Sequence, residues 1–238
     1  MQYISQPKIS VVTVTFNSIQ SLQETINSVL GQTYENKEYV IVDGNSSDGT
    51  KEFLGSYRNK IRWVSEPDEG IYDAMNKALS MATGDFVIFL GADDHFLSYS
   101  TLKEATAYMN DPNAVYYGNV FRSSRNDIYK GKFNKYKLSL ENICHQSIFY
   151  PRAVYKTNKY NLKYNVYADY YYNLSIYPLF KFVYIPKTIC YYNYDGFSSL
   201  NKDVEFEKIV NQFVRQQNGC VAYLLRLLYL LYKRLRLR

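Results

Sequence analysis

Alternating apolar and polar positions predict a regular strand and helix pattern in the first hundred residues. The β-branched run Ile9–Thr15 has the length of a buried strand. After Asn17 and Ser18, which can cap a helix, apolar residues recur at helical spacing until Gly31 stops the pattern. Further strands are expected at 39–42, 61–64 and 86–90. One helix is expected to follow the polar turn at 43–49 and to end at 57, and another is expected at 71–82. This alternation predicts a largely parallel sheet covered on both faces.

The pattern becomes less regular beyond residue 94. Helices are expected at 100–110 and 168–177, and strands at 115–121, 128–133, 181–185 and 189–194. The sequence contains neither a clear repeat nor a low-complexity linker. The second half, 100–200, is therefore expected to extend the domain that begins in 1–99, and a helical tail is expected at 201–238.

Composition places the chain among folded proteins, because 47% of its residues are hydrophobic and 21% are charged. The 27 tyrosines and 13 phenylalanines suit half-buried packing more than any one ligand class. Cys144, Cys190 and Cys220 have no paired spacing, so neither a disulfide framework nor a zinc site is indicated, as expected for the cytoplasm. Residues 1–8 lack an apolar signal region, so export is not expected.

Polar residues follow each of the four predicted parallel strands. They are Thr15-Phe16-Asn17, Asp43, Glu66-Pro67-Asp68-Glu69 and Asp93-Asp94. Each cluster alone also suits a turn or a helix cap. Because ligands of open α/β sheets bind outside the carboxyl ends of the strands, the joint placement of the clusters predicts a binding rim.

The adjacent carboxylates Asp93 and Asp94 are the most specific of these clusters. They follow a strongly apolar strand and the small residues Gly91 and Ala92. Two such carboxylates repel each other unless a cation compensates them. Oxygen ligands of this kind select Mg²⁺ or Mn²⁺, which commonly bridge a carboxylate to substrate phosphates. The pair predicts a divalent metal site, and a solvated turn is the alternative.

Three motifs in this order resemble family 2 glycosyltransferases of the GT-A fold: 9–17, 41–50 and 84–94. The segment 66–77 looks like the branch that builds bacterial surface polysaccharides such as O-antigen or capsule. The resemblance covers about the first hundred residues. It implies an α/β GT-A domain over 1–200, with a mostly parallel mixed sheet flanked by helices. It also implies inverting sugar transfer, with a nucleotide-diphosphate sugar bound by 1–99 and the acceptor bound by 100–200.

The resemblance also implies roles for donor-binding residues. Thr15, Phe16, Asn17 and Asp43 would line the pocket for the nucleotide base, and Asp68 and Asn76 would contribute further donor contacts. Asp94 would bind Mn²⁺ or Mg²⁺, with Asp93 nearer the ribose, because Ala92 occupies the first position of the acidic motif. Relatives carry an Arg before the Asn76 equivalent, where this chain has Met75, which leaves Lys77 as a substitute for the phosphate contact.

Fewer positions match in the second half. The segment Cys144-His145-Gln146-Ser147 resembles a His-Gln pair near the donor sugar. This implies a functional role for His145, and a structural histidine is the alternative. Asp169 occupies the place of the catalytic base, and a helix N-cap is the alternative. Gly196 and Ser198 lie in a segment that resembles a loop closing over the diphosphate.

The tail from Cys220 onward combines leucines and tyrosines with basic residues that supply much of the net charge of +6. Arg226 interrupts the apolar run, which is too short and too charged to span a bilayer. Such a helix suits an anionic membrane surface, so we expect peripheral attachment at the inner face of the cell membrane and no nucleic-acid partner. A helix packed on the core or on a second subunit of a homodimer is the alternative.

Two rival functions follow from the same residues. A sugar-nucleotide nucleotidyltransferase would show a glycine-rich basic loop after the first strand, which 15–19 is not. A non-catalytic, membrane-associated protein that binds sugar nucleotides would keep the fold without turnover, against which the presence of Asp94 and Asp169 argues. The expected acceptor of the transferase is a lipid-linked sugar or a polysaccharide.

Overall fold

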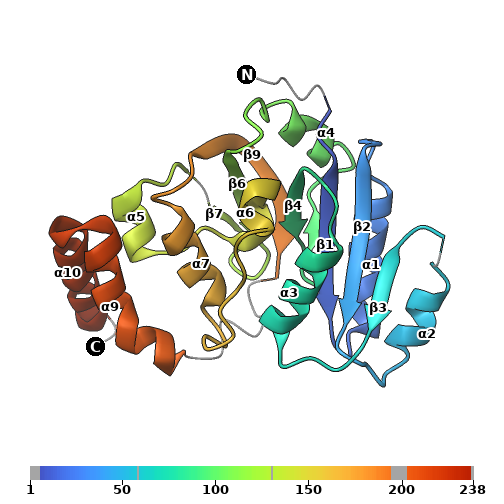
Figure 1. The fold of residues 1–238 in the computed structure, drawn as a ribbon, viewed down its shortest axis with the longest axis horizontal. Helices are drawn as coiled ribbons and strands as arrows, with labels where there is room; N and C mark the ends of the chain where they lie inside the picture. Colours follow the sequence, from blue (N-terminus) through green and yellow to red (C-terminus); the bar gives the residue numbers. More distant parts are fainter. Residues whose placement is uncertain (1–5, 58, 130, 194–202, 237–238) are drawn as a thin grey trace.

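A computed structural model describes residues 6–57, 59–129, 131–193 and 203–236, and one nine-stranded mixed sheet runs through them (Figure 1). Its strand order is β3-β2-β1-β4-β8-β6-β9-β5, and β7 pairs with β6 beside this path. The strands are β1 (Ile9–Thr15), β2 (Lys37–Asp43), β3 (Arg62–Ser65), β4 (Phe86–Phe89), β5 (His95–Phe96), β6 (Val115–Arg122), β7 (Asp127–Tyr129), β8 (Ile148–Pro151) and β9 (Phe182–Tyr192).

Helices cover both faces of this sheet. They are α1 (Ile19–Leu30), α2 (Thr50–Gly55), α3 (Ile71–Met81), α4 (Thr101–Thr106), α5 (Lys135–Leu140), α6 (Arg152–Tyr155), α7 (Ala168–Ile176), α9 (Val204–Asn218) and α10 (Cys220–Arg236), with a 3-10 turn η1 (His145–Ser147). Side chains alternate along each strand, so Val11 packs in the cluster that contains α1 while Val12 packs in the cluster that contains α3. The apolar strands therefore form the middle layer of the molecule.

The first four predicted strands form the parallel half of the sheet. β1 pairs in parallel with β2 and β4, and β2 pairs in parallel with β3. The register places Thr15 opposite Asp43, and Asp43 opposite Ser65. The polar strand ends thus lie along one edge, which confirms the predicted arrangement of strands, and the helices predicted after β1 and β3 are confirmed as α1 and α3.

The second half differs from its sequence pattern at β9. Two separate strands were expected at 181–185 and 189–194, whereas β9 is one long strand paired with β6 across register shifts. Gly118 lies at these shifts, where an added Cβ would stand 2.6 Å from Ile189 Cγ1 and 2.7 Å from the Lys187 carbonyl oxygen. Because the β6 and β9 backbones approach closely here, the register of their pairing shifts but the pairing continues. Periodicity did not reveal the short strands β5 and β8 because they span only 2 and 4 residues.

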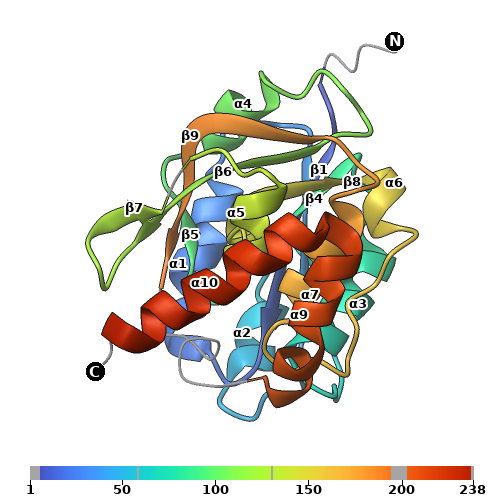
Figure 2. The same cartoon turned by 90° about the vertical axis from the view of Figure 1, so that its left-hand side faces the viewer.

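The expected helical tail is present as α9 and α10. Both helices lie at the end of the molecule opposite β2 and β3 (Figure 1), and α10 crosses that end (Figure 2). Arg226 of α10 is buried against this end of the molecule. Within the described ranges, none of the helices combines the length and the apolar character needed to cross a membrane.

Replacement of Gly84 by Ala tests how tightly β1 meets the start of β4. An added Cβ at Gly84 would stand 2.6 Å from Ser10 N and 2.8 Å from the Lys8 carbonyl oxygen, so the backbone must shift. We expect Gly84→Ala to lower the free energy of unfolding by about 1 to 3 kcal/mol, measured by urea titration. Gly55→Ala is the control because nothing lies within 4 Å of its added Cβ. Equal unfolding midpoints for the two variants would contradict the packing described for Gly84.

Candidate active site

A cleft of about 1640 Å³ extends from the carboxyl edge of the parallel strands to the α9–α10 tail. It is bordered by the ends of β1 and β4, by α3, by η1 and by the start of α7. Seven residues predicted for the site line it: Thr15, Phe16, Asp68, Asp93, Asp94, His145 and Asp169. Residues from both halves of the sequence therefore meet in one cleft.

Asp94 is held in place by three separate segments. Its carboxylate accepts hydrogen bonds from Gly91 N at 3.0 Å, from Gln146 Nε2 at 3.0 Å and from Asn193 N at 2.9 Å. Only 2% of the residue is exposed. An added Cβ at Gly91 would stand 2.6 Å from Asp94 Oδ2, so a side chain at position 91 would displace the carboxylate. Asp94 is thus an anchored, buried carboxylate rather than part of a solvated turn.

The environment of Asp94 disfavours its negative charge. Burial, and then repulsion by the neighbouring Asp93 carboxylate, raise the pKa of Asp94 to about 6, against the lowering effect of its hydrogen bonds. Asp93 itself is exposed and accepts a hydrogen bond from Asn193 Nδ2 at 3.0 Å. A cation at the mouth of this pair would offset both the burial and the repulsion.

The protein supplies only part of a metal coordination shell here. Among the described residues, no group of three or more His, Cys, Asp or Glu side chains is placed to hold a metal ion. Asp94 and Asp93 still offer carboxylate oxygens, the ligand type that Mg²⁺ and Mn²⁺ prefer. The residues therefore fit an ion that takes its remaining ligands from substrate phosphates and water.

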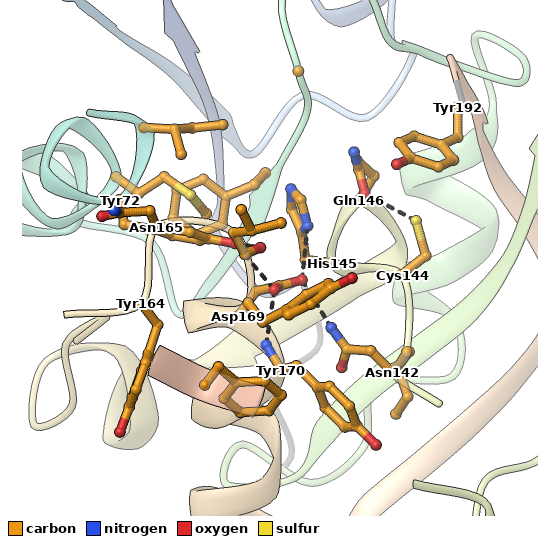
Figure 3. A pocket seen from close by; sticks show the side chains of 18 of the residues that line it. Tyr72, Asn142, Cys144, His145, Gln146, Tyr164, Asn165, Asp169, Tyr170 and Tyr192 are labelled. Carbon is orange, nitrogen blue, oxygen red and sulfur yellow. Dashed lines mark hydrogen bonds and ion pairs between the residues drawn. The ribbon is translucent and has the colours of Figure 1, made fainter. Parts of the chain in front are cut away.

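Asp169 is the second carboxylate of the cleft. It accepts hydrogen bonds from Asn142 Nδ2 and Tyr170 N, both at 2.8 Å, and the Tyr72 hydroxyl lies 3.1 Å from its Oδ1 (Figure 3). It stands in the first turn of α7, while Tyr167 occupies the N-cap position. The alternative interpretation of Asp169 as an N-cap is therefore wrong. The hydrogen bonds fix the direction in which its carboxylate faces the cleft.

The turn η1 reaches both carboxylates with adjacent side chains. His145 Nδ1 lies 3.3 Å from Asp169 Oδ2 (Figure 3), and Gln146 donates to Asp94. The Cys144 thiol donates to Gln146 Oε1 at 2.9 Å, which orients the amide so that its NH₂ group faces Asp94. Burial raises the pKa of the Cys144 thiol, so the thiol stays protonated and keeps this role. One short turn thus fixes the positions of both acids.

No role was predicted from the sequence for two of these residues, Tyr72 and Asn142. They contact Asp169 across 97 and 27 positions of sequence, so no local pattern could indicate them. Gln146 belongs to the pair that resembles residues near the donor sugar, and its side chain donates to Asp94.

Thr15 and Phe16 present two different surfaces at the end of β1. Phe16 is 63% exposed and lines the cleft, where its ring offers a face for stacking. Thr15 Oγ1 is buried and finds no hydrogen-bond partner within the described residues. Buried polar atoms are nearly always satisfied, so a bound ligand or water is expected to satisfy this hydroxyl.

Two predicted donor-binding residues, Asn17 and Asp43, do not line the cleft. Asp43 is fully buried and accepts hydrogen bonds from Ser46 N at 3.0 Å, from Ser65 Oγ at 2.6 Å and from the Ser46 hydroxyl. Asn17 accepts a hydrogen bond from Ser47 N at 2.9 Å through Oδ1. In this structure both side chains organise the loops that follow β1 and β2.

Asn76 likewise turns away from the cleft. Its side chain donates to the Tyr160 carbonyl oxygen and accepts from Tyr160 N, both at 2.9 Å, which ties α3 to a distant loop. Lys77 forms ion pairs with carboxylates on its own helix and the preceding loop, so it is not placed as a phosphate ligand. Asp68 lines the cleft, and its Oδ1 accepts a hydrogen bond from Gly70 N at 2.9 Å. Gly196 and Ser198 lie outside the described residues.

Comparison with known sequences gives one consistent result. Residues 10–177 match the family described as Glycosyl transferase family 2. The chain is 33% identical over 234 residues to the PGL/p-HBAD biosynthesis glycosyltransferase of Mycobacterium tuberculosis, covering 94% of this chain and 91% of the relative. The names of these matches are those of glycosyltransferases and not of nucleotidyltransferases.

Solved structures with the same fold include two enzyme complexes. Staphylococcus aureus TarS 1-349 in complex with UDP-GlcNAc aligns with a TM-score of 0.71 and 22% identity, over 94% of this chain and 71% of that one. The mannosyltransferase PcManGT from Pyrobaculum calidifontis, in complex with GDP-Man and Mn²⁺, aligns with a TM-score of 0.66 and 16% identity, over 96% of this chain and 75% of that one. These similarities establish the GT-A fold.

The raised pKa of Asp94 predicts a pH-dependent cost of keeping this residue ionised. Because its pKa rises from 3.8 to about 6 on folding, protonation stabilises the folded state, and this benefit is lost as the pH increases from about 4 to above 6. The predicted quantity is the free energy of unfolding of wild type minus that of Asp94→Asn, both measured in EDTA. This difference should fall by roughly 2 to 3 kcal/mol between pH 4 and pH 7.5. Urea titrations at both pH values measure it, and a constant or rising difference would contradict the burial of an ionised Asp94.

Proposed function

Because this chain belongs to glycosyl transferase family 2 and is a glycosyltransferase, we propose that it transfers a sugar from a nucleotide-diphosphate donor to a hydroxyl of a lipid-linked or polysaccharide acceptor. One observation carries the proposal. The turn η1 holds Asp94 and Asp169 in a single cleft through adjacent side chains. This arrangement provides one acid for the donor phosphates and another for the acceptor hydroxyl.

The donor binds at the strand-end part of the cleft. TarS is known in complex with UDP-GlcNAc and PcManGT in complex with GDP-Man and Mn²⁺, which supports a nucleotide-sugar donor for a chain of this fold. In this chain the exposed ring of Phe16 offers a stacking face for the base, and the unsatisfied Thr15 hydroxyl offers a polar contact beside it. Asp93 is the exposed carboxylate at the ribose side, and Asp68 borders the same space.

Asp94, assisted by Asp93, is the residue that would hold Mn²⁺ or Mg²⁺. When bound, such an ion acts as a Lewis acid and stabilises the charge that develops on the departing diphosphate. The contribution of this chain is to fix the Asp94 carboxylate with donors from Gly91, Gln146 and Asn193 before any substrate arrives. An ion at this place would find a carboxylate whose position is already set.

Asp169 acts as the general base. It takes the proton of the acceptor hydroxyl while that oxygen forms a bond to the anomeric carbon of the donor sugar. The bond from that carbon to the diphosphate breaks, and its electron pair leaves with the nucleoside diphosphate. Attack from the opposite side inverts the anomeric configuration. Tyr72 at Oδ1 and Asn142 at Oδ2 hold the carboxylate in the required direction, and His145 contacts the same oxygen as Asn142.

The outer side of α10 attaches the enzyme to the inner face of the cell membrane. Leu224, Leu228 and Leu231 are 56%, 63% and 55% exposed, and they lie on one side of the helix. Arg236 follows in the last turn of the same helix, is exposed and does not line the cleft, and a cation beside an apolar helix face favours anionic lipids. Attachment at this surface brings the cleft to the level of a lipid-linked acceptor.

Removal of the proposed base should abolish transfer and spare donor binding. We expect Asp169→Asn to lower kcat at least about a hundredfold, the usual contribution of a general base. The stabilisation of the variant by nucleotide and Mn²⁺, measured by thermal unfolding, should stay as in wild type. Asp111→Asn, a substitution outside the cleft lining, is the control and should retain activity. Undiminished turnover by Asp169→Asn would show that another group is the base.

The membrane role of α10 predicts an effect on vesicle binding. We expect the triple change Leu224→Gln, Leu228→Gln and Leu231→Gln to weaken binding to phosphatidylglycerol vesicles at least about tenfold, because each leucine loses apolar burial. Sedimentation with vesicles measures the effect.

A matched control removes the same number of exposed apolar side chains elsewhere: Leu97→Gln, Ile128→Gln and Leu179→Gln. This control should bind vesicles as wild type does. If the α10 variant binds vesicles normally, or if it instead converts a dimer to a monomer in the absence of lipid, the membrane assignment is wrong.

A further inference from the structure

The basic side of the helix α10 faces the cleft, and its most exposed leucines face away from the cleft. Arg226, Tyr229, Leu230, Lys233 and Arg234 line the cleft, and they recur at the spacing of one helix face. Leucines more than half exposed occupy the other side. Figure 2 shows α10 crossing this end of the molecule in front of α5 and beside α9. Such a helix brings cations into the site as well as an apolar surface to the outside.

Arg226 is a buried cation without a counter-charge. It is 8% exposed, and its donors reach the Ser139 carbonyl oxygen at 2.6 Å and Asn211 Oδ1 at 3.0 Å, with the Tyr170 hydroxyl at 3.4 Å. Within the described part of the chain it forms no ion pair with a carboxylate, and its Nη2 donates to no residue. A buried charge of this kind is costly unless an anion compensates it.

Two further cations of α10 share this side of the cleft. Across the described ranges, neither Lys233 nor Arg234 forms an ion pair with a carboxylate, and the Lys233 ammonium lies 4.6 Å from the centre of the Tyr229 ring. Two acids line this part of the cleft, Glu207 and Glu141, and Glu141, the C-cap of α5, pairs with a lysine of that helix at 3.7 Å. Among the described residues, neither acid lies within ion-pair distance of Arg226, Lys233 or Arg234.

A chain of contacts links Arg226 to Asp169 more directly than to the metal-binding acid. Tyr170, whose hydroxyl lies 3.4 Å from Arg226, donates through its backbone N to Asp169. Asp94 is linked to Asp169 only through the adjacent side chains of Gln146 and His145. The cations of α10 are therefore assigned to the acceptor part of the proposed site, where the base stands.

We propose that Arg226, Lys233 and Arg234 form an anion subsite that holds the phosphate of an amphiphilic acceptor. The inference rests on the proposed function, because it names the class of acceptor for the same cleft. The acceptor hydroxyl stands at Asp169, its phosphate ester lies against the three cations, and its hydrocarbon chain leaves the cleft along α10 toward the membrane. Charge-assisted contacts to phosphate oxygens compensate the buried Arg226.

Direct binding tests the subsite without requiring turnover. Dodecyl phosphate, dodecyl β-glucoside and inorganic phosphate are titrated below micelle formation into the full chain, with nucleotide and Mn²⁺ present to occupy the donor end. We expect dodecyl phosphate to bind at least about tenfold more tightly than either of the others, as paired charge-assisted hydrogen bonds contribute. The double variant Lys233→Gln and Arg234→Gln should lose this preference.

The control variant, Lys208→Gln and Arg215→Gln, removes the same charge from exposed positions of α9 that do not line the cleft, and it should keep the preference. The subsite is refuted if wild type binds dodecyl phosphate no better than the glucoside or inorganic phosphate. It is also refuted if the Lys233 and Arg234 variant retains the preference. Hydrolysis of the donor by water, measured in parallel, should be equal in wild type and in the Lys208 and Arg215 control, so a failure of the proposed transferase activity would be seen separately from a loss of the subsite.

Discussion

The cleft depends on the way in which two buried carboxylates are satisfied by one short turn. Gln146 donates to Asp94 while its neighbour His145 contacts Asp169, so the two acids keep a fixed relation. A buried carboxylate requires donors, and here the donors come from segments distant in sequence. The Asp94 carboxylate joins the end of β4 to the end of β9, and Asp169 joins α7 to α3 and to the segment before η1. The fold and the site are therefore set by the same contacts.

The electrostatic layout of the cleft follows from this arrangement. The strand ends carry acids, and the raised pKa of Asp94 reflects the cost of holding two carboxylates there. The tail carries cations, of which Arg226 is buried against neutral acceptors. At the acidic strand ends, the missing positive charge would come from the cation that accompanies the donor diphosphate. At the basic α10 side, the missing negative charge would come from the phosphate of the acceptor. The proposed membrane contact of the apolar outer side of α10 would hold the acceptor part of the cleft next to the membrane surface.

The sequence predicted the parallel strands because their apolar runs are long and periodic, and it predicted the edge where their polar ends meet. It also identified both acids of the cleft, since residue types in ordered motifs carry that information. It could not show which polar side chains are already used in hydrogen bonds to other segments of the chain, as those of Asp43 and Asn76 are. Contacts across long sequence separations, such as that of Tyr72 with Asp169, leave no local pattern. The direction in which α10 turns its basic side was likewise decided by tertiary packing.

Asp169 is proposed as the base of a single displacement at the anomeric carbon, and the configuration of the first product tests this role most directly. Once a donor has been found by screening nucleotide sugars, the anomeric proton of the transferred sugar is followed by NMR from the start of the reaction. The coupling constant should show a product whose configuration is opposite to that of the donor. A product that retains the donor configuration would contradict direct attack by a hydroxyl activated at Asp169.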